Sequence, residues 1–260
     1  MQLGNRHRVD LFEVGQLRFV ETAGPDLSPA MRSTMDSAWG EAVLANPALF
    51  DGPVVLCTEL DQAASGNLVV SWARATYRYR VLRQLQGAPA LSSVFVCVLQ
   101  PTQDGRLLIG RMSNSTSFPG QLQFPGGNME PPPTGQPLTT DDLRRHAVVE
   151  LAEELGVQTT IEKLDLWSAV RVPNGNIGFF FTAPSLPDDL LIRRHALLVD
   201  TERECGREPE FADVALIRGG DDLTGIDGNP AEYLGPLVSQ FFAAASPLNE
   251  PNRTEPVNRN

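Results

Sequence analysis

The residues of this chain best suited to chemistry are three glutamates, Glu150, Glu153 and Glu154, in a stretch rich in helix-forming residues. At the spacing i, i+3 and i+4, a helix places the three carboxylates on one face. Like charges this close destabilise a helix unless they are neutralised. A hard divalent cation such as Mg²⁺ removes that penalty, because it prefers oxygen ligands and binds through a few carboxylates plus substrate phosphates. The spacing therefore indicates either a metal site or a solvated helix face, where glutamates are also common.

The residues around the glutamates favour the metal site. The predicted helix ends at Gly156, a good C-terminal stop. A proline-rich loop precedes it, and before that loop stands the pair Gly126-Gly127, expected to form a turn. Glycines let the backbone approach a ligand and present its carbonyl or amide groups. The opposite face of the helix carries an apolar stripe made of Leu143, Ala147, Val148, Leu151 and Leu155.

Together the two segments resemble the Nudix box, Gly-x5-Glu-x7-Arg-Glu-U-x-Glu-Glu-x-Gly-U, where U is a bulky aliphatic residue. Gly127 matches the glycine of the box, and the run from Glu150 to Val157 matches its second half. A strict count would put the box glycine on Gly135. The glycine pair is the better equivalent if residues 131–137 are an insertion, which we expect to be a flexible loop near the cleft.

Two positions depart from the family pattern. Val149 stands where the family has an arginine that orients a catalytic glutamate, and Asp141 stands in place of the first glutamate. Arg144 and Arg145 are the nearby candidates to replace the arginine. We therefore expect a working but atypical site.

The resemblance implies metal-dependent hydrolysis of a nucleoside diphosphate linked to another moiety, by attack of water on phosphorus. It makes Glu150 and Glu154 the principal ligands of Mg²⁺, with Mn²⁺ as a possible substitute. Glu153 would complete the cluster or activate water, and the Gly127 carbonyl would be a further ligand. The family often uses a base outside the box. Glu210 is the candidate and Glu208 the alternate; both are equally interpretable as solvated loop carboxylates.

The N-terminal part resembles the Nudix branch that cleaves UDP-glucose and UDP-galactose to UMP and a hexose 1-phosphate. The resemblance rests on Trp39, residues 46–53 and 76–78, and the Gly126–Pro131 run. It implies that the partner is a small-molecule nucleotide, preferably a UDP-sugar. The substrate-binding candidates are Tyr77, Arg78, Arg111 and Phe124, together with Phe50, for which core packing is the favoured interpretation.

Two further functions stay open. One is a Nudix pyrophosphatase acting on ADP-ribose, a dinucleotide or a coenzyme A derivative. The other is a non-catalytic domain that senses a nucleotide, which Val149 and Asp141 favour and the three intact glutamates oppose.

Composition narrows the class of partner. The net charge of −11 argues against nucleic-acid binding, which depends on Lys and Arg to neutralise phosphates. No signal peptide or membrane span is expected, and the longest apolar runs are short. Cys57, Cys97 and Cys205 lack zinc-ligand spacing, and the first two are expected to be buried thiols. We expect a cytoplasmic enzyme; the sequence leaves its oligomeric state open.

The order of predicted elements indicates an α/β protein, compatible with the Nudix-type α/β/α sandwich with a mixed sheet, preceded by an N-terminal α+β extension. We expect residues 1–88 to pack on a Nudix domain at 89–246, and 247–260 to be a disordered tail. Helices are predicted at 28–46, 77–86, 188–198 and 229–245, besides the one carrying the glutamates. Strands are predicted at 9–20, 54–60, 68–75, 92–100, 106–111, 161–172, 177–182 and 211–217.

Overall fold

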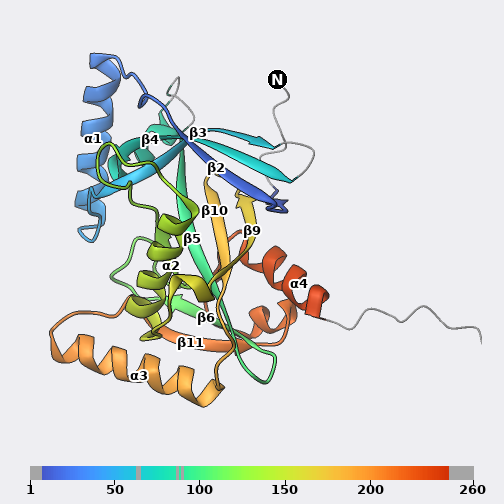
Figure 1. Cartoon of the computed structure of the whole chain (residues 1–260). Coiled ribbons are helices and arrows are strands. Elements are labelled where there is room, and N and C mark those ends of the chain that lie inside the picture. Colours follow the sequence, from blue (N-terminus) through green and yellow to red (C-terminus); the bar gives the residue numbers. More distant parts are fainter. Residues whose placement is uncertain (1–7, 63–65, 86–87, 89–90, 246–260) are drawn as a thin grey trace, which may run out of the picture.

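The computed structural model of the chain describes residues 8–62, 66–85, 88 and 91–245. Four α-helices and a twelve-stranded mixed sheet make up this part of the molecule (Figure 1). The helices are α1 (Pro29–Ala45), α2 (Thr140–Leu155), α3 (Asp188–Glu204) and α4 (Leu234–Ala245). The strands are β1 (Asp10–Phe12), β2 (Gln16–Glu21), β3 (Pro53–Gln62), β4 (Asn67–Thr76), β5 (Ser92–Pro101), β6 (Leu107–Met112), β7 (Gln121–Gln123), β8 (Gly126–Asn128), β9 (Asp165–Arg171), β10 (Ile177–Thr182), β11 (Phe211–Ile217) and β12 (Asn229–Pro230).

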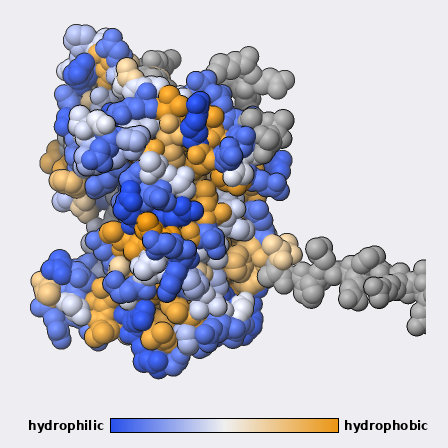
Figure 2. Space-filling model, in the orientation of Figure 1, coloured by the Kyte–Doolittle hydropathy of each residue, from blue (hydrophilic) through white to orange (hydrophobic). Residues whose placement is uncertain are grey.

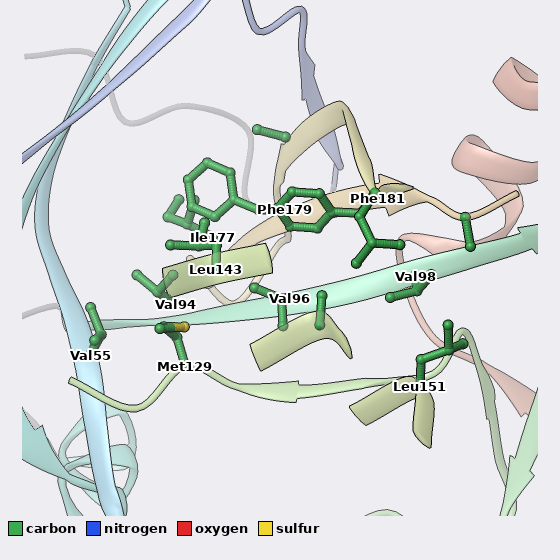
Figure 3. Close-up of a cluster of buried hydrophobic side chains, with 14 of the residues drawn as sticks. Val55, Val94, Val96, Val98, Met129, Leu143, Leu151, Ile177, Phe179 and Phe181 are labelled. Carbon is green, nitrogen blue, oxygen red and sulfur yellow. The ribbon is translucent and has the colours of Figure 1, made fainter. Parts of the chain in front are cut away.

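Strand β5 lies at the centre of the molecule, and its two faces bury side chains in different cores. Val94, Val96 and Val98 face the core that α2 covers, whereas Cys97 and Leu99 face the core that α4 covers. Figure 3 shows the first of these cores, in which side chains of β5, β10 and α2 pack together. Alternation of side chains along a strand explains how one apolar run serves both layers. The predicted α/β/α layering around a mixed sheet is confirmed.

The N-terminal strands continue the same sheet. The main path runs β1-β9-β10-β5-β3-β4-β2, in which β5 pairs parallel with β10 and antiparallel with β3. Helix α1 packs on a 3₁₀ helix at Tyr77–Gln84 and closes a small third core against β3. Because backbone pairing joins the two parts, the division into domains at residue 88 stays a prediction.

Helix α2 is fixed at both ends by its own sequence. Thr139 and Asp142 form a capping box at the N-terminus, and Gly156 ends the helix with a left-handed φ of 67°. The apolar stripe predicted for this helix is buried against β5 and β10, and Glu154 is buried with it. The packing of the stripe therefore sets the direction in which the glutamates point.

Several predicted elements differ in extent. The strand predicted at 9–20 is divided into β1 and β2 around Gly15, whose N–H donates to the carbonyl oxygen of Gly66. The stretch 161–172 begins with a 3₁₀ turn before β9, and the segment 77–86 is 3₁₀ rather than α-helical through Gln84. Helix α3 continues to Glu204, six residues past its predicted end at 198.

Two corrections concern the C-terminal part and the glycine pair. The helix predicted from residue 229 starts only at Leu234, because Asn229 and Pro230 pair with β7 as strand β12. The glycine pair is part of strand β8, paired with β5, rather than a turn. The tail predicted at 247–260 lies outside the described residues.

The surface of the molecule is mostly polar. Figure 2 shows a largely hydrophilic face with smaller apolar patches. Cys57 and Cys97 are buried as predicted, and Cys205 is exposed. None of the helices in the described part of the chain is long and apolar enough to cross a membrane.

Candidate active site

The glycine pair brings the backbone of β8 against the glutamates of α2. The N–H of Gly126 donates a hydrogen bond to Glu154 Oε2 at 2.5 Å. A Cβ atom on Gly127 would stand 2.2 Å from Glu150 Oε1, and one on Gly126 would stand 2.1 Å from the carbonyl oxygen of Val96. Both positions therefore need glycine, since any side chain would separate β8 from the helix or from β5.

Glu154 is the most deeply buried acidic side chain of the site, with 1% of its surface exposed. Its Oε1 atom has no hydrogen-bond partner among the described residues. Burial, followed by the charges of Glu210 and Glu150, raises the pKa of Glu154 well above its ordinary value. A buried carboxylate oxygen without a partner is costly, and neighbouring negative charges add to the cost. This oxygen fits a divalent cation, which prefers hard oxygen ligands and would remove both penalties.

His146 lies beside Glu150, one turn earlier on α2. Its Nε2 stands 3.0 Å from Glu150 Oε1, and both side chains are mostly buried. The two atoms are close, but their alignment is poor for a hydrogen bond. Nε2 of His146 therefore has no well-aligned hydrogen-bond partner among the described residues. Burial lowers the pKa of His146, but the contact with Glu150 and its negative charge outweigh burial and raise the pKa overall.

Glu153 is exposed on the same side of the helix. Burial of part of its side chain, and then the charge of Glu150, raise its pKa. No three acidic, histidine or cysteine side chains in the described part of the chain converge closely enough to hold a metal ion. The glutamates influence one another electrostatically but are not arranged as ligands in this conformation, in which Glu150 faces His146.

Glu210 precedes β11, and its carbonyl oxygen accepts a hydrogen bond from the N–H of Ser113 at 2.8 Å. Neighbouring atoms shield the carboxyl of Glu210 from water. This desolvation, followed by the negative charges of Glu150 and Glu153, raises the pKa of the carboxyl to about 7. The residue as a whole is nevertheless exposed to solvent. Glu210 lines the main cavity, whereas the alternate base Glu208 does not.

That cavity has a volume of about 610 Å³ and extends from the glycine pair to the N-terminal region. Its lining includes Gly127, Glu130 and Glu210, together with Phe50 and Tyr77 from the N-terminal region. A volume of this size suits a small-molecule ligand. Glu150, Glu153 and Glu154 do not line the cavity themselves. It reaches the carboxylate helix through Gly126 and Gly127, against which Glu150 and Glu154 lie.

The predicted substrate-binding residues are not all brought together. Tyr77 lines the cavity, but Arg78 does not, and pairs with Asp51 at 2.5 Å and Asp36 at 3.2 Å. Arg111 lies on β6 and faces Asp213 at 3.8 Å, also outside the cavity lining.

Two aromatic residues have the opposite exposure to the one predicted for them. Phe124 is fully buried against Phe180 and Tyr233, so in this structure it supports the cleft wall instead of facing a substrate. Phe50, for which core packing was favoured, is 79% exposed and lines the cavity. An aromatic residue in a loop gives no sequence signal that separates these two cases.

Neither arginine considered as a replacement reaches the glutamates. Arg144 pairs with Asp141 at 2.8 Å, and Arg145 pairs with Asp142 at 2.6 Å. Both are held at the first turn of α2, and Val149 is exposed. His146 is the basic side chain beside Glu150, and sequence reasoning missed this contact. Its i, i+4 spacing to Glu150 was the available signal.

Glu130 and Tyr233 were also missed as parts of the site. Glu130 follows β8 and lines the cavity, and its charge contributes to the raised pKa of Glu153. Tyr233 lines the cavity from just before α4, roughly 80 residues after the three glutamates along the chain. No local pattern links such a distant residue to the glutamates.

Comparisons with known proteins give only remote similarity. No protein-family model matches the sequence, and no curated protein sequence matches it significantly. Solved structures that resemble it include a MutT protein from Methanosarcina mazei Go1, with 16% identity, a TM-score of 0.38, and coverage of 59% of this chain and 91% of that one. Another is DR0079 from Deinococcus radiodurans, with 19% identity, a TM-score of 0.35, and coverage of 59% and 87%. The E. coli ORF135 protein has 18% identity, a TM-score of 0.36, and coverage of 61% and 96%. TM-scores this low do not carry a functional assignment, which therefore has to rest on the side chains of the cleft.

Proposed function

We propose that this protein is a metal-dependent Nudix-type hydrolase that cleaves a nucleoside diphosphate linked to another moiety. The observation that carries the proposal is Glu154: a buried carboxylate, tied to Gly126, with an oxygen that has no partner among the described residues. Glu150, Glu153 and Glu210 are the acidic neighbours that raise its pKa. In the described structure no lysine or arginine pairs with these glutamates, and the basic neighbour of Glu150 is His146. Carboxylates without a lysine or arginine partner can bind the divalent cation that a diphosphate substrate requires.

Glu150, Glu154 and Glu153, with the carbonyl of Gly127, would hold Mg²⁺, or Mn²⁺ in its place. When bound, the ion neutralises charge on the phosphate oxygens and lowers the pKa of the attacking water. Binding requires Glu150 to turn from His146, because the present arrangement does not converge on one point. In the present arrangement Glu150 lies against β8 in the space that a side chain on Gly127 would fill.

Glu210 is the residue we assign as general base. It lines the cavity and its pKa is raised to about 7, close to the value at which a base both accepts and releases a proton at neutral pH. Its carboxylate would take a proton from the water that attacks phosphorus. The reaction breaks the bond between the attacked phosphorus and the bridging oxygen of the diphosphate, and releases two monophosphates.

For the substrate we propose a UDP-hexose, cleaved to UMP and a hexose 1-phosphate. The N-terminal segment that resembles the UDP-glucose and UDP-galactose branch forms one side of the cavity, through Phe50 and Tyr77. The cavity volume of about 610 Å³ is sufficient for a nucleotide-sized ligand.

The experiment that tests this function measures release of nucleoside monophosphate from UDP-, ADP- and GDP-linked compounds, with Mg²⁺ and with EDTA. Metal-dependent turnover concentrated on UDP-hexoses would support the whole proposal. Turnover concentrated on ADP-ribose or a dinucleotide would retain the chemistry and reject the substrate. Nucleotide binding without turnover on any compound would instead identify a sensor, and would contradict the hydrolase.

A further inference from the structure

Two exposed phenylalanines lie on the wall of the cavity. Phe50 is 79% exposed and Phe118 is 47% exposed. Among the large hydrophobic side chains exposed in the described part of the chain, these two are the aromatic ones, and both line the same cavity. Exposed rings gathered at one cleft indicate a ligand that covers them, because leaving aromatic surface in water is unfavourable.

The two loops that carry these rings are held together. Phe50 lies in the segment 46–52 after α1, and Phe118 lies in the segment 113–120 between β6 and β7. The side-chain amide of Asn46 donates to the carbonyl oxygen of Thr116 at 3.4 Å, which links the two segments. The ring of Phe50 also lies over Gly52, where a Cβ atom would stand 3.1 Å from it. The two loops are therefore linked, and the ring of Phe50 lies close to the backbone of Gly52.

Arg80 adds a positive charge beside these rings. Its guanidinium carbon stands 4.9 Å from the centroid of Tyr77 and 5.6 Å from that of Phe118, within the range of cation–π attraction. It also donates to the hydroxyl of Tyr77 at 2.6 Å. Arg80 pairs with no acidic side chain in the described structure, unlike Arg78 two residues before it. Arg80 does not line the cavity itself, but it brings a positive charge next to Tyr77 and Phe118, which do.

We propose that Phe50 and Phe118 form a subsite that binds the nucleobase of the substrate by stacking, with Arg80 fixing Phe118 and Tyr77 in place. This inference rests on the proposed function and specifies how its substrate is held. A planar base presents two π faces to such rings, and base–aromatic stacking is strong and tolerant of base identity. The diphosphate would then extend from the subsite toward Gly127 and Glu210, which line the same cavity.

The test is binding rather than turnover, so that it stands apart from the hydrolase assignment. Calorimetry in EDTA measures the Kd values of UMP, of ribose 5-phosphate, which lacks the base, and of glucose 1-phosphate. In Phe50→Ala and in Phe118→Ala we expect the Kd of UMP to rise about tenfold. We expect ribose 5-phosphate and glucose 1-phosphate to be unaffected. Phe50→Tyr, which keeps the ring, should bind UMP like the wild type.

Leu44→Ala is the matched control. Leu44 is 85% exposed near the end of α1 and does not line the cavity, so its loss should leave every Kd unchanged. The subsite would be rejected if both alanine variants, folded by circular dichroism, bound UMP with wild-type Kd. It would also be rejected if the affinity for ribose 5-phosphate or glucose 1-phosphate fell as much as that for UMP. Absence of hydrolysis with this UMP pattern intact would overturn the proposed function and leave the subsite standing.

Discussion

The carboxylate of Glu150 occupies the space that a side chain on Gly127 would need, since a Cβ atom there would lie 2.2 Å from Glu150 Oε1. The two residues come from different elements, strand β8 and helix α2. Their contact fixes the distance between the backbone of the glycine pair and the acidic face of the helix. Any ion held by both would depend on that distance.

Substitution of Gly127 tests this contact. In Gly127→Ala the methyl group must displace Glu150, and we expect overpacking to cost about 1–3 kcal/mol of unfolding free energy. Activity should fall further than stability explains, because the displaced carboxylate is a proposed ligand. Thermal unfolding and kcat/KM measure the two effects. The control is Gly40→Ala in α1, where a Cβ atom would meet no other atom within 4 Å. Unchanged kcat/KM in Gly127→Ala would refute the role of the contact.

Neutralising Glu154 separates stability from catalysis. Glu154→Gln keeps the shape of the side chain and an acceptor for the N–H of Gly126, but cannot ionise beside Glu150, Glu153 and Glu210. Without metal, we expect the free energy of unfolding at pH 8 to rise by about 1 kcal/mol. Hydrolysis should fall by more than the roughly 100-fold typical of losing an outer-shell partner of a metal.

Calorimetric unfolding in EDTA and the hydrolysis assay measure the two quantities. A Glu154→Gln variant that is less stable than wild type without metal, or that retains activity, would contradict the placement of this residue. Glu208→Gln, an exposed acid outside the cavity lining, is the control expected to change neither quantity by a large amount.

The stability of the metal-free protein should decrease with rising pH. Glu153, Glu154 and Glu210 all have folded-state pKa values raised above the ordinary value of 4.5, and that of Glu210 is about 7. At a pH between the unfolded-state and folded-state pKa values, the folded protein holds more protons than the unfolded chain. The stability that these glutamates contribute is therefore greatest below pH 4.5 and is lost as the pH rises through about 7.

Unfolding curves at pH 5 to 8, in EDTA and in Mg²⁺, measure this dependence. We expect Mg²⁺ to reduce the loss at higher pH, since it binds the ionised carboxylates of the folded state. Glu210→Gln should flatten the curve in EDTA. A curve in EDTA that rises across this range in wild type, but not in Glu210→Gln, would reverse the sign of the shift at Glu210.

Removal of His146 should affect the metal-free form most. In His146→Ala, Glu150 loses the basic neighbour that stands 3.0 Å away, and we expect a loss of about 1 kcal/mol of unfolding free energy in EDTA, more than an exposed i, i+4 pair contributes. The loss should shrink in saturating Mg²⁺. Thermal unfolding in both conditions measures it. Arg193→Ala, which breaks the exposed i, i+4 pair with Asp189, provides the comparison. An equal loss with and without Mg²⁺ would assign His146 a packing role only.

Much of the site could be predicted from local patterns. The helical spacing of the three glutamates and the stop at Gly156 were predicted from rules that act within a few residues. The continuous apolar run of β5 predicted a strand, and the structure shows that both of its faces are buried. Failures occurred where a long-range contact decides the outcome. Phe50 and Phe124 have similar local surroundings, yet the tertiary packing exposes one and buries the other.

The sequence by itself therefore determined the carboxylate helix and the order of the main elements, because periodicity and capping act through neighbouring residues. Only the tertiary structure decided that Gly126 and Gly127 pair with β5 as a strand, that His146 faces Glu150, and that the cavity runs to the exposed ring of Phe50. These relationships depend on which strands pair and which helix faces are buried together. Such choices are set by the packing of the whole core and not by any single segment.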